Sequence, residues 1–110
     1  MSEEVFVVLT TWPDAAVARE AARVLVEAKI VACANLLPGV ESIYRWEGAV
    51  ETAAEVLVIF KMATHRFPEF ERRLPALHPY DVPEIVALRV AEGLPAYLRW
   101  VEESCVAAAH

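Results

Sequence analysis

The sequence predicts an α+β fold in which strands and helices alternate as β-α-β-β-α-β, followed by an extra C-terminal helix. Two observations lead to this fold. Apolar runs rich in β-branched residues recur along the chain and are bounded by turn residues, as buried strands are. Between them lie two segments whose apolar residues recur at helical spacing, with charged residues on the opposite side.

The first half of the chain begins with a β-branched and aromatic run, Val5–Leu9, which predicts a buried strand. Thr11-Trp12-Pro13-Asp14 then has the hydroxyl cap, early proline and acidic residue of a helix start. The other elements expected in this half are a helix over Ala15–Ala28, a strand over Ile30–Leu37, an extended stretch over Val40–Trp46 after Pro38-Gly39, and a hairpin turn at Glu47-Gly48.

The second half repeats the alternation of strand and helix. Thr64 is expected to cap a helix that ends near Leu77, with Pro75 weakening its last turn. His78–Pro83 is expected to be a loop, because each proline disfavours helix at the residue before it. The remaining elements expected here are strands over Val50–Met62 and Ile85–Val90 and a final helix over Leu94–Val106.

This order is the split-βαβ, or ferredoxin-like, arrangement, in which helices cover one face of an antiparallel sheet. The other face is left bare. The two central strands are longer than the usual five or six residues, so we expect them to overhang the domain. Both features invite association with other molecules.

Composition supports association. The 110 residues are 57% hydrophobic, above the 45–50% of typical soluble domains, and we expect residues 1–110 to form a single domain. The longest apolar runs are five residues, too short to cross a membrane, and the acidic start is unlike a secretory signal. The surplus of apolar side chains is therefore expected to be buried in an oligomer.

Charge and cysteine content exclude further classes of protein. The net charge is −6 and there are two lysines, so we expect no nucleic-acid partner. Two cysteines without a CxxC motif suit reduced thiols in the cytoplasm. The chain contains no glutamine and one asparagine, Asn35, which lies inside an apolar stretch. No nucleophile elbow, phosphate-binding glycine loop or HExxH motif is present, so no catalytic motif is found.

Two segments concentrate the polar and aromatic groups. His78–Glu84 places an imidazole, a phenol and two carboxylates in seven residues, and it reads either as the rim of a binding pocket or as a stiff turn. Tyr44 and Trp46 share one face of the strand before the hairpin turn. They form either an interface or ligand wall, or cross-strand aromatic pairs that stabilise the hairpin.

Two further positions interrupt apolar strands. Glu55 and Lys61 share a face of the third strand, and Lys61 is either paired and partly buried or, as we favour, marks the exit of the strand to solvent. Cys33 reads as a small buried hydrophobe in preference to a metal ligand. No local pair of donors has the spacing of a metal site.

The chain resembles the CutA family of divalent-cation tolerance proteins over nearly its whole length and in order. The residues that carry the resemblance are Thr11-x-Pro13, Ala32-Cys33-Ala34-Asn35, Leu37-Pro38-Gly39, Ser42-x-Tyr44-x-Trp46-x-Gly48, Glu55 with Lys61, His78-Pro79-Tyr80-x-x-Pro83-Glu84 and Tyr97-x-x-Trp100.

The resemblance implies a ferredoxin-like homotrimer similar to PII signalling proteins, tolerance of copper and other divalent cations, copper binding, no organic cofactor and no established enzymatic reaction. It implies an inter-subunit cleft lined by Asn35, Tyr44, Trp46, Glu55, Lys61, His78, Tyr80, Glu84 and Trp100. A Cu(II) or similar cation would be held by Cys33, His78 and Glu84. Other cysteines linked to metal in some members are absent, and Ala49 and Met62 replace the lysine and threonine that are common in the family.

Three functions follow as alternatives. The first, which we favour for the role but not for the mechanism, is a cytoplasmic trimer that responds to a divalent metal and binds Cu(II) or a similar cation. The second is a PII-like sensor that binds a small molecule or anion in the cleft formed by Tyr44, Trp46, Lys61 and His78. The third is a structural adaptor trimer, in which the cleft residues hold the subunits together and no ligand is bound.

Overall fold

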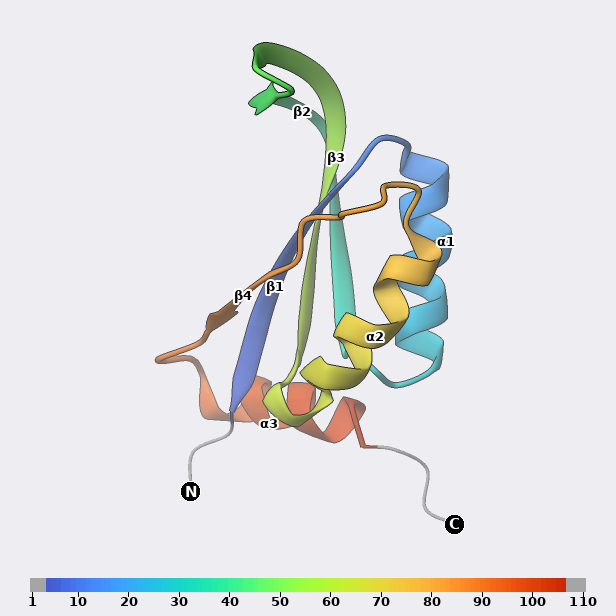
Figure 1. Ribbon diagram of the computed structural model, residues 1–110. Helices are drawn as coiled ribbons and strands as arrows, with labels where there is room; N and C mark the ends of the chain where they lie inside the picture. The colour runs from blue at the N-terminus through green and yellow to red at the C-terminus, as the bar shows by residue number, and fades with distance from the viewer. Residues whose placement is uncertain (1–3, 107–110) are drawn as a thin grey trace.

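The computed structural model describes residues 4–106, which fold into one four-stranded sheet and its helices (Figure 1). In chain order the elements are β1 (Val5–Trp12), α1 (Ala15–Glu27), β2 (Cys33–Trp46), β3 (Ala49–Ala63), the 3₁₀ turn η1 (Thr64–Arg66), α2 (Phe67–Leu77), β4 (Val86–Arg89) and α3 (Pro95–Ser104). None of these helices combines the length and the apolarity that a membrane crossing requires.

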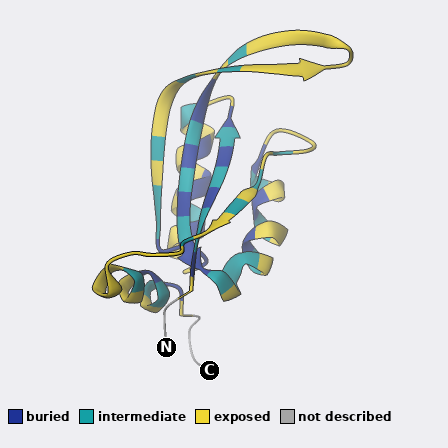
Figure 2. Cartoon of the chain, turned by 90° about the vertical axis from the view of Figure 1, so that its left-hand side faces the viewer, coloured by how far each residue is buried: buried dark blue, intermediate teal, exposed yellow. Residues whose placement is uncertain are grey.

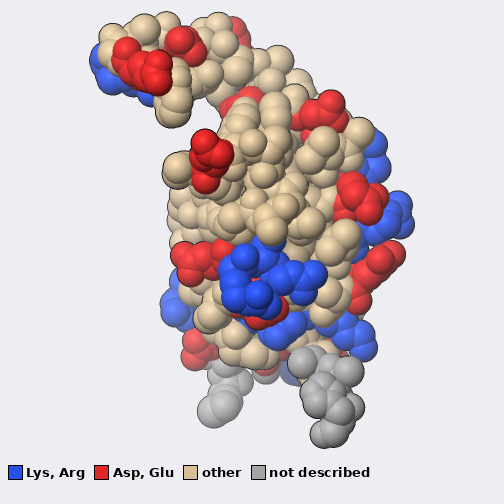
Figure 3. Space-filling model, turned by 45° about the vertical axis from the view of Figure 1, so that its right-hand side comes forward, with Lys and Arg blue, Asp and Glu red and all other residues tan. Residues whose placement is uncertain are grey.

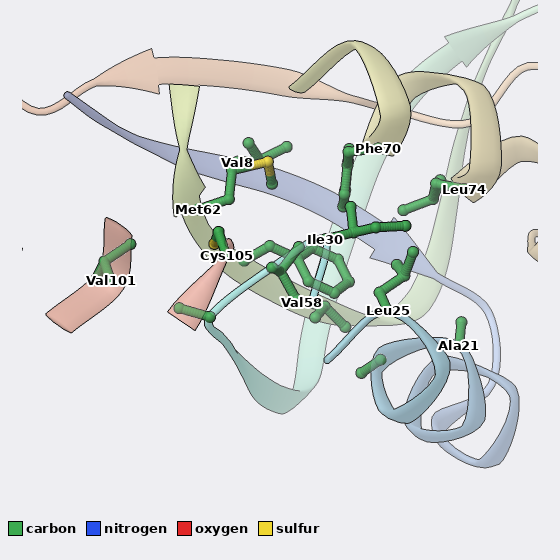
Figure 4. Packing of buried hydrophobic residues seen from close by; sticks show 14 of the residues in the cluster. Val8, Ala21, Leu25, Ile30, Val58, Met62, Phe70, Leu74, Val101 and Cys105 are labelled. Carbon is green, nitrogen blue, oxygen red and sulfur yellow. The ribbon is translucent and has the colours of Figure 1, made fainter. Parts of the chain in front are cut away.

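The sheet has the strand order β2-β3-β1-β4, and every neighbouring pair is antiparallel. Helices α1 and α2 cover one face of it, and α3 lies across the end where β1 begins (Figure 1). This is the α+β arrangement with an extra C-terminal helix that the sequence predicts. The core lies between the sheet and the two helices α1 and α2 (Figure 4). There, Phe60 packs edge-on against Phe70. Val58 and Leu25 are fully buried.

The start of α1 differs from the prediction. β1 continues past Leu9 to Trp12, whose side chain is fully buried. Asp14, and not Thr11, caps the helix, because its carboxylate accepts hydrogen bonds from the N–H groups of Ala16 and Val17 at 2.7 and 3.1 Å. Burial of the Trp12 ring therefore keeps the chain extended one residue beyond the expected cap, and the cap moves from Thr11 to Asp14.

β2 unites two stretches that the sequence separates. The predicted strand from Ile30 begins only at Cys33, and it continues through Pro38-Gly39 to Trp46 as one strand. Leu37 pairs with Leu57 and Val40 pairs with Glu55, so two residues of β2 oppose one of β3 in a β-bulge. The bulge shifts the alternation of side chains by one residue. As a result, Cys33, Asn35 and Leu37 lie on the same side of the ladder as the even-numbered residues of the hairpin.

The β2–β3 hairpin extends beyond the body of the domain and bends over at its end, where most residues are exposed (Figure 2). This overhang agrees with the expectation from strand length. Its turn residues Glu47 and Gly48 both have positive φ, of 50° and 81°. Such angles are typical of the two-residue turns that match the twist of a hairpin.

The second half differs from the prediction mainly at element ends. Thr64 does not cap α2 through its side chain; it opens the 3₁₀ turn η1, from which α2 continues. Pro75 lies inside α2, near its end. The predicted strand Ile85–Val90 is reduced to the four residues of β4, and α3 is shorter than Leu94–Val106 by one residue at its start and two at its end.

His78 ends α2 and fastens the following loop to β1. Its ring lies 4.1 Å from the Trp12 ring, and its Nε2 is 2.8 Å from the carbonyl oxygen of Thr11. Its Nδ1 accepts a hydrogen bond from the N–H of Tyr80 at 3.0 Å, so Nε2 carries the proton and donates to Thr11. Burial lowers the pKa of His78, although the Thr11 carbonyl and Glu55 oppose that shift. The buried imidazole is therefore neutral at pH 7.

The loop after α1 contains a residue in an unfavourable backbone conformation. The N–H of Ile30 donates to the carbonyl of Leu25 and that of Lys29 donates to Val26, which is the Schellman pattern of a helix C-terminus. Lys29 occupies the position that usually holds glycine, with φ of 61°. A side chain at this angle is strained because its Cβ crowds the backbone.

We expect Lys29→Gly to raise the free energy of unfolding by about 1 kcal/mol, because glycine adopts this conformation without strain. Lys29→Ala is the matched control: it removes the same charge and keeps the Cβ, so it should give no comparable gain. Urea unfolding of the three proteins measures the effect. Equal stability of the glycine and alanine variants would contradict this interpretation.

We expect His78 to make stability depend on pH below its ordinary pKa of 6.5. Between that value and the lowered folded-state pKa, the unfolded chain binds a proton that the folded chain does not. The free energy of unfolding therefore rises with pH across this window, and the stabilisation is complete only above the ordinary pKa.

The measurement is urea unfolding of wild type and His78→Asn between about pH 5 and about pH 8. Asparagine supplies one donor and one acceptor but does not titrate, so the difference between the two curves isolates the imidazole. The two proteins should lose stability at different rates as the pH falls below 6.5. Parallel curves would show that the imidazole makes no such contribution.

Candidate functional site

The candidate site lies on the face of the sheet opposite α1 and α2, which we call the open face. The strand register defines it, because alternate residues share a face. Its residues are Val7, Leu9 and Thr11 of β1, Cys33, Asn35, Leu37 and Val40 of β2, Glu55, Leu57, Ile59 and Lys61 of β3, and Val86 and Leu88 of β4. It is mainly apolar, with one acidic and one basic residue on β3.

Glu55 marks the acidic end of the open face. It pairs with Val40, the first residue of β2 after the bulge, and it is 9% exposed. The hydroxyl of Tyr80, from the loop after α2, donates a hydrogen bond of 2.8 Å to Glu55 Oε2. Burial and this bond raise the pKa of Tyr80 to about 12, so the phenol is neutral and remains a donor.

Tyr44 and Glu84 lie near this end. The phenol of Tyr44 is close enough to Tyr80 to add to the rise in the pKa of Tyr80. The hydroxyl of Thr11 donates to Glu84 Oε1 at 3.5 Å, which is a long contact for a hydrogen bond. The structure thus gathers three of the predicted cleft residues, Glu55, Tyr80 and Glu84, around the last residues of β1 and the bulge, where His78 holds the loop, and Tyr44 lies farther along the hairpin, opposite Glu51.

Lys61 marks the basic end, where the open face meets α3. Its ammonium nitrogen lies 5.8 Å from the centre of the Tyr97 ring. Cys33, which pairs with Lys61 across the ladder, has its sulfur 3.8 Å from the Tyr97 hydroxyl. Burial is the main cause that raises the pKa of Tyr97, and the contact with Cys33 is the second. β3 continues beyond Lys61 to Ala63, so the expected exit of the strand at Lys61 is wrong.

Of the other predicted residues, Trp100 adjoins the basic group, whereas Asn35 and Trp46 lie apart from both groups. Trp100 packs against Tyr97 at 5.6 Å between ring centres and is exposed on α3. Asn35 is exposed in the middle of β2, opposite Ile59, and Trp46 is exposed at the end of the hairpin. One chain therefore spreads the predicted cleft residues along the open face and the hairpin.

The predicted metal ligands do not converge within one chain. Cys33 is opposite Lys61 on β3. Glu84 contacts Thr11, which is opposite Leu57, and Leu57 lies four residues before Lys61 on β3. That separation is about 13 Å along the strand. Both nitrogens of His78 are engaged in hydrogen bonds, so the imidazole has no free lone pair for a metal. Across residues 4–106, no three His, Cys, Asp or Glu side chains are grouped to hold an ion.

Sequence reasoning left two contributors out of the predicted cleft. Tyr97 connects Cys33 and Lys61, and its three-residue spacing from Trp100 was the signal that both rings share a side of α3. Thr11 supplies the carbonyl that fixes His78. No sequence pattern indicates that contribution, because it is made by the backbone.

The helical side of the molecule offers a different surface. A shallow hollow of about 270 Å³ lies between α1 and β2, lined by Arg19, Ala22, Arg23, Val26, Glu27, Ala34 and Leu36. On α2, Arg72 pairs with Glu69, and Arg73 lies 3.9 Å from the same carboxylate. Lys and Arg side chains are prominent on this side, whereas the overhanging hairpin carries both signs of charge (Figure 3).

Comparison with known proteins places this architecture in a family. A divalent-cation tolerance protein CutA from Thermus thermophilus is 52% identical over 98 residues, covering 89% of this chain and 95% of that protein. A protein CutA from Mus musculus is 42% identical over 93 residues, and this chain spans about half of its length, 52%.

A solved structure of a divalent cation tolerance protein (CutA1) from Thermus thermophilus superposes with a TM-score of 0.89 at 51% identity, covering 91% of this chain and 97% of the other. The family described as CutA1 divalent ion tolerance protein matches residues 6–104, nearly the whole of the described chain. The family description names a tolerance and no reaction. The chain therefore belongs to the CutA1 divalent ion tolerance family.

Proposed function

We propose that this protein acts as a homotrimer whose subunits meet over the open face and whose ligand site is a cleft at that interface. The observation that carries the proposal is the exposure of large apolar side chains on the open face of a single chain. Leu37 is 41% exposed and Leu88 is 51% exposed. Apolar faces of this kind mark association sites.

The overhanging hairpin supports the same proposal. Trp46 is 58% exposed and Tyr44 lies on the same side of the hairpin, so two large rings stand clear of the domain that carries them. Rings of this kind are enriched at protein interfaces. The outer edges of β2 and β4 also have no partner strand among residues 4–106. The number of three subunits rests on the family resemblance.

The ligand proposal favours a small molecule over direct coordination of copper. A copper site made by Cys33, His78 and Glu84 would need donors from different chains and a broken hydrogen bond at His78. The open face instead offers a carboxylate, an ammonium group, phenols and apolar surface. These are the groups that line small-molecule sites. His78 then serves the cleft by positioning Tyr80.

The protein thus contributes to cation tolerance without catalysis, as a single domain over residues 1–110 that responds to a ligand in the manner of a PII-like sensor. A cytoplasmic location stays a prediction. The relatives occupy more than one compartment, since a related protein from Arabidopsis thaliana is named chloroplastic.

We expect Leu37→Glu to dissociate the trimer while each subunit stays folded, because the charge would be buried at the interface but is solvated in the free chain. Val17→Glu is the matched control: Val17 is 39% exposed, on α1 and away from the open face. Sedimentation velocity and circular dichroism measure assembly and folding. A monomeric wild type, or equal effects of both substitutions, would contradict the proposal.

Calorimetric titration with Cu(II) separates the small-molecule proposal from a metal site. We expect wild type and the double variant His78→Asn, Glu84→Gln to bind Cu(II) alike, because both nitrogens of His78 are engaged in hydrogen bonds and the exposed Glu84 offers a single carboxylate that belongs to no group of three donors among the described residues. Loss of Cu(II) binding in the double variant, with its trimer intact, would instead support direct metal coordination at this end of the open face.

A further inference from the structure

Glu55 is a nearly buried carboxylate for which this chain supplies no positive charge. The side chain is 9% exposed. The ion pairs found within residues 4–106 are made by Glu4 and Glu69, and no Lys, Arg or His nitrogen lies within 4 Å of Glu55. Buried charges in proteins are normally paired. The position of Glu55 therefore calls for a cation from outside the chain.

The neighbours of Glu55 do not neutralise it. Tyr80 donates a hydrogen bond to Oε2, but its phenol is uncharged. His78 is neutral, since its Nδ1 accepts the N–H of Tyr80. The second carboxylate oxygen, Oε1, has no hydrogen bond from any described residue. A carboxylate with one oxygen held in place and the other available is oriented for a further donor.

One aromatic residue contacts this carboxylate and others share its side of the hairpin. The Tyr80 hydroxyl contacts it directly, and Tyr44 lies on the same side, opposite Glu51. Trp46 continues on the same side of the hairpin. The faces of such rings attract organic cations. A nearly buried carboxylate that holds one phenol and has further aromatic residues on its side of the hairpin is thus suited to an ammonium or guanidinium group.

A divalent metal ion fits this position less well. Calcium requires six or more oxygen ligands, and magnesium retains several waters around one or two carboxylates. Among the described residues, no three acidic, histidine or cysteine side chains are grouped around any point. We propose that Glu55, Tyr80 and Tyr44 form a binding site for an organic cation, specifically a primary ammonium or a guanidinium group.

Two sources could supply that group. One is a free amine, which binds in the cleft as a ligand. The other is a basic side chain of a neighbouring subunit, and this source rests on the proposed function. Lys61 shares the open face but lies six residues along β3 from Glu55, about 20 Å away. It cannot reach the Glu55 of its own chain, so a pairing of Lys61 with Glu55 must join two copies.

The test compares wild type with Glu55→Gln, which removes the charge and keeps an acceptor for Tyr80. Glu41→Gln is the matched control, because Glu41 is exposed on β2 and lies on the opposite side of the ladder. Each protein is titrated with n-butylamine hydrochloride and with n-butanol as the uncharged analogue. Binding is followed by intrinsic fluorescence and thermal unfolding, and assembly by sedimentation velocity.

If the source is a free amine, wild type and Glu41→Gln bind butylammonium but not butanol, and Glu55→Gln binds it at least tenfold more weakly while it still assembles in the absence of amine. If the source is a neighbouring subunit, Glu55→Gln weakens self-association at least tenfold. Lys61→Met then has the same effect, and the double variant is no weaker than either single one.

The proposal is overturned if Glu55→Gln, folded by circular dichroism, matches Glu41→Gln in both amine binding and assembly. Binding of butanol as tightly as butylammonium would also overturn it. A monomeric wild type would contradict the proposed trimer alone, since the amine titration can be carried out on the monomer. Failure of the cation site and failure of the trimer are therefore distinguishable.

Discussion

β3 pairs with β1 along one edge and with β2 along the other, and its alternating side chains divide the molecule into a packed side and an open side. Even-numbered residues such as Val58 and Phe60 are buried beneath α1 and α2. The odd-numbered Glu55 and Lys61 face the open side. The bulge in β2 preserves this division along the hairpin, because it returns Tyr44 to the side of Glu55. Without the extra residue, every hairpin side chain beyond Leu37 would change faces.

The second constraint is the attachment of the loop after α2. His78 links that loop to β1 through the Thr11 carbonyl and simultaneously accepts the N–H of Tyr80, so one imidazole determines where the Tyr80 hydroxyl can reach. The hydroxyl reaches Glu55. A residue that resembles a metal ligand by type is thus a positioning residue by geometry, since its two nitrogens are already engaged. The loop is a stiff turn that also carries Tyr80 to the candidate site, so the two interpretations of its sequence do not exclude each other.

Much of the fold follows from patterns within short segments, and the misses have local physical reasons. The apolar runs identify all four strands. Burial of Trp12 extends β1 past the apparent helix cap. The left-handed conformation at position 29 could not be predicted, because it is adopted by Lys29 and not by a glycine. The site depends on contacts between distant segments. Glu55 and Tyr80 are each conspicuous in the sequence, yet their hydrogen bond follows from the register of β3 and the anchoring of His78. Neither the register of β3 nor the anchoring of His78 can be recognised in a single sequence.

The apolar surplus and the uncompensated charge of Glu55 are connected. A neighbouring subunit that covers the open face removes water from Leu37 and Leu88, which favours assembly. The same subunit removes water from Glu55, which opposes assembly unless a cation accompanies the carboxylate. In the assembly that we propose, cation binding at Glu55 and self-association are therefore linked, and each must strengthen the other by the same free energy. A sheet face that is mostly apolar but carries one buried carboxylate is thereby able to couple the state of an assembly to the presence of a cation.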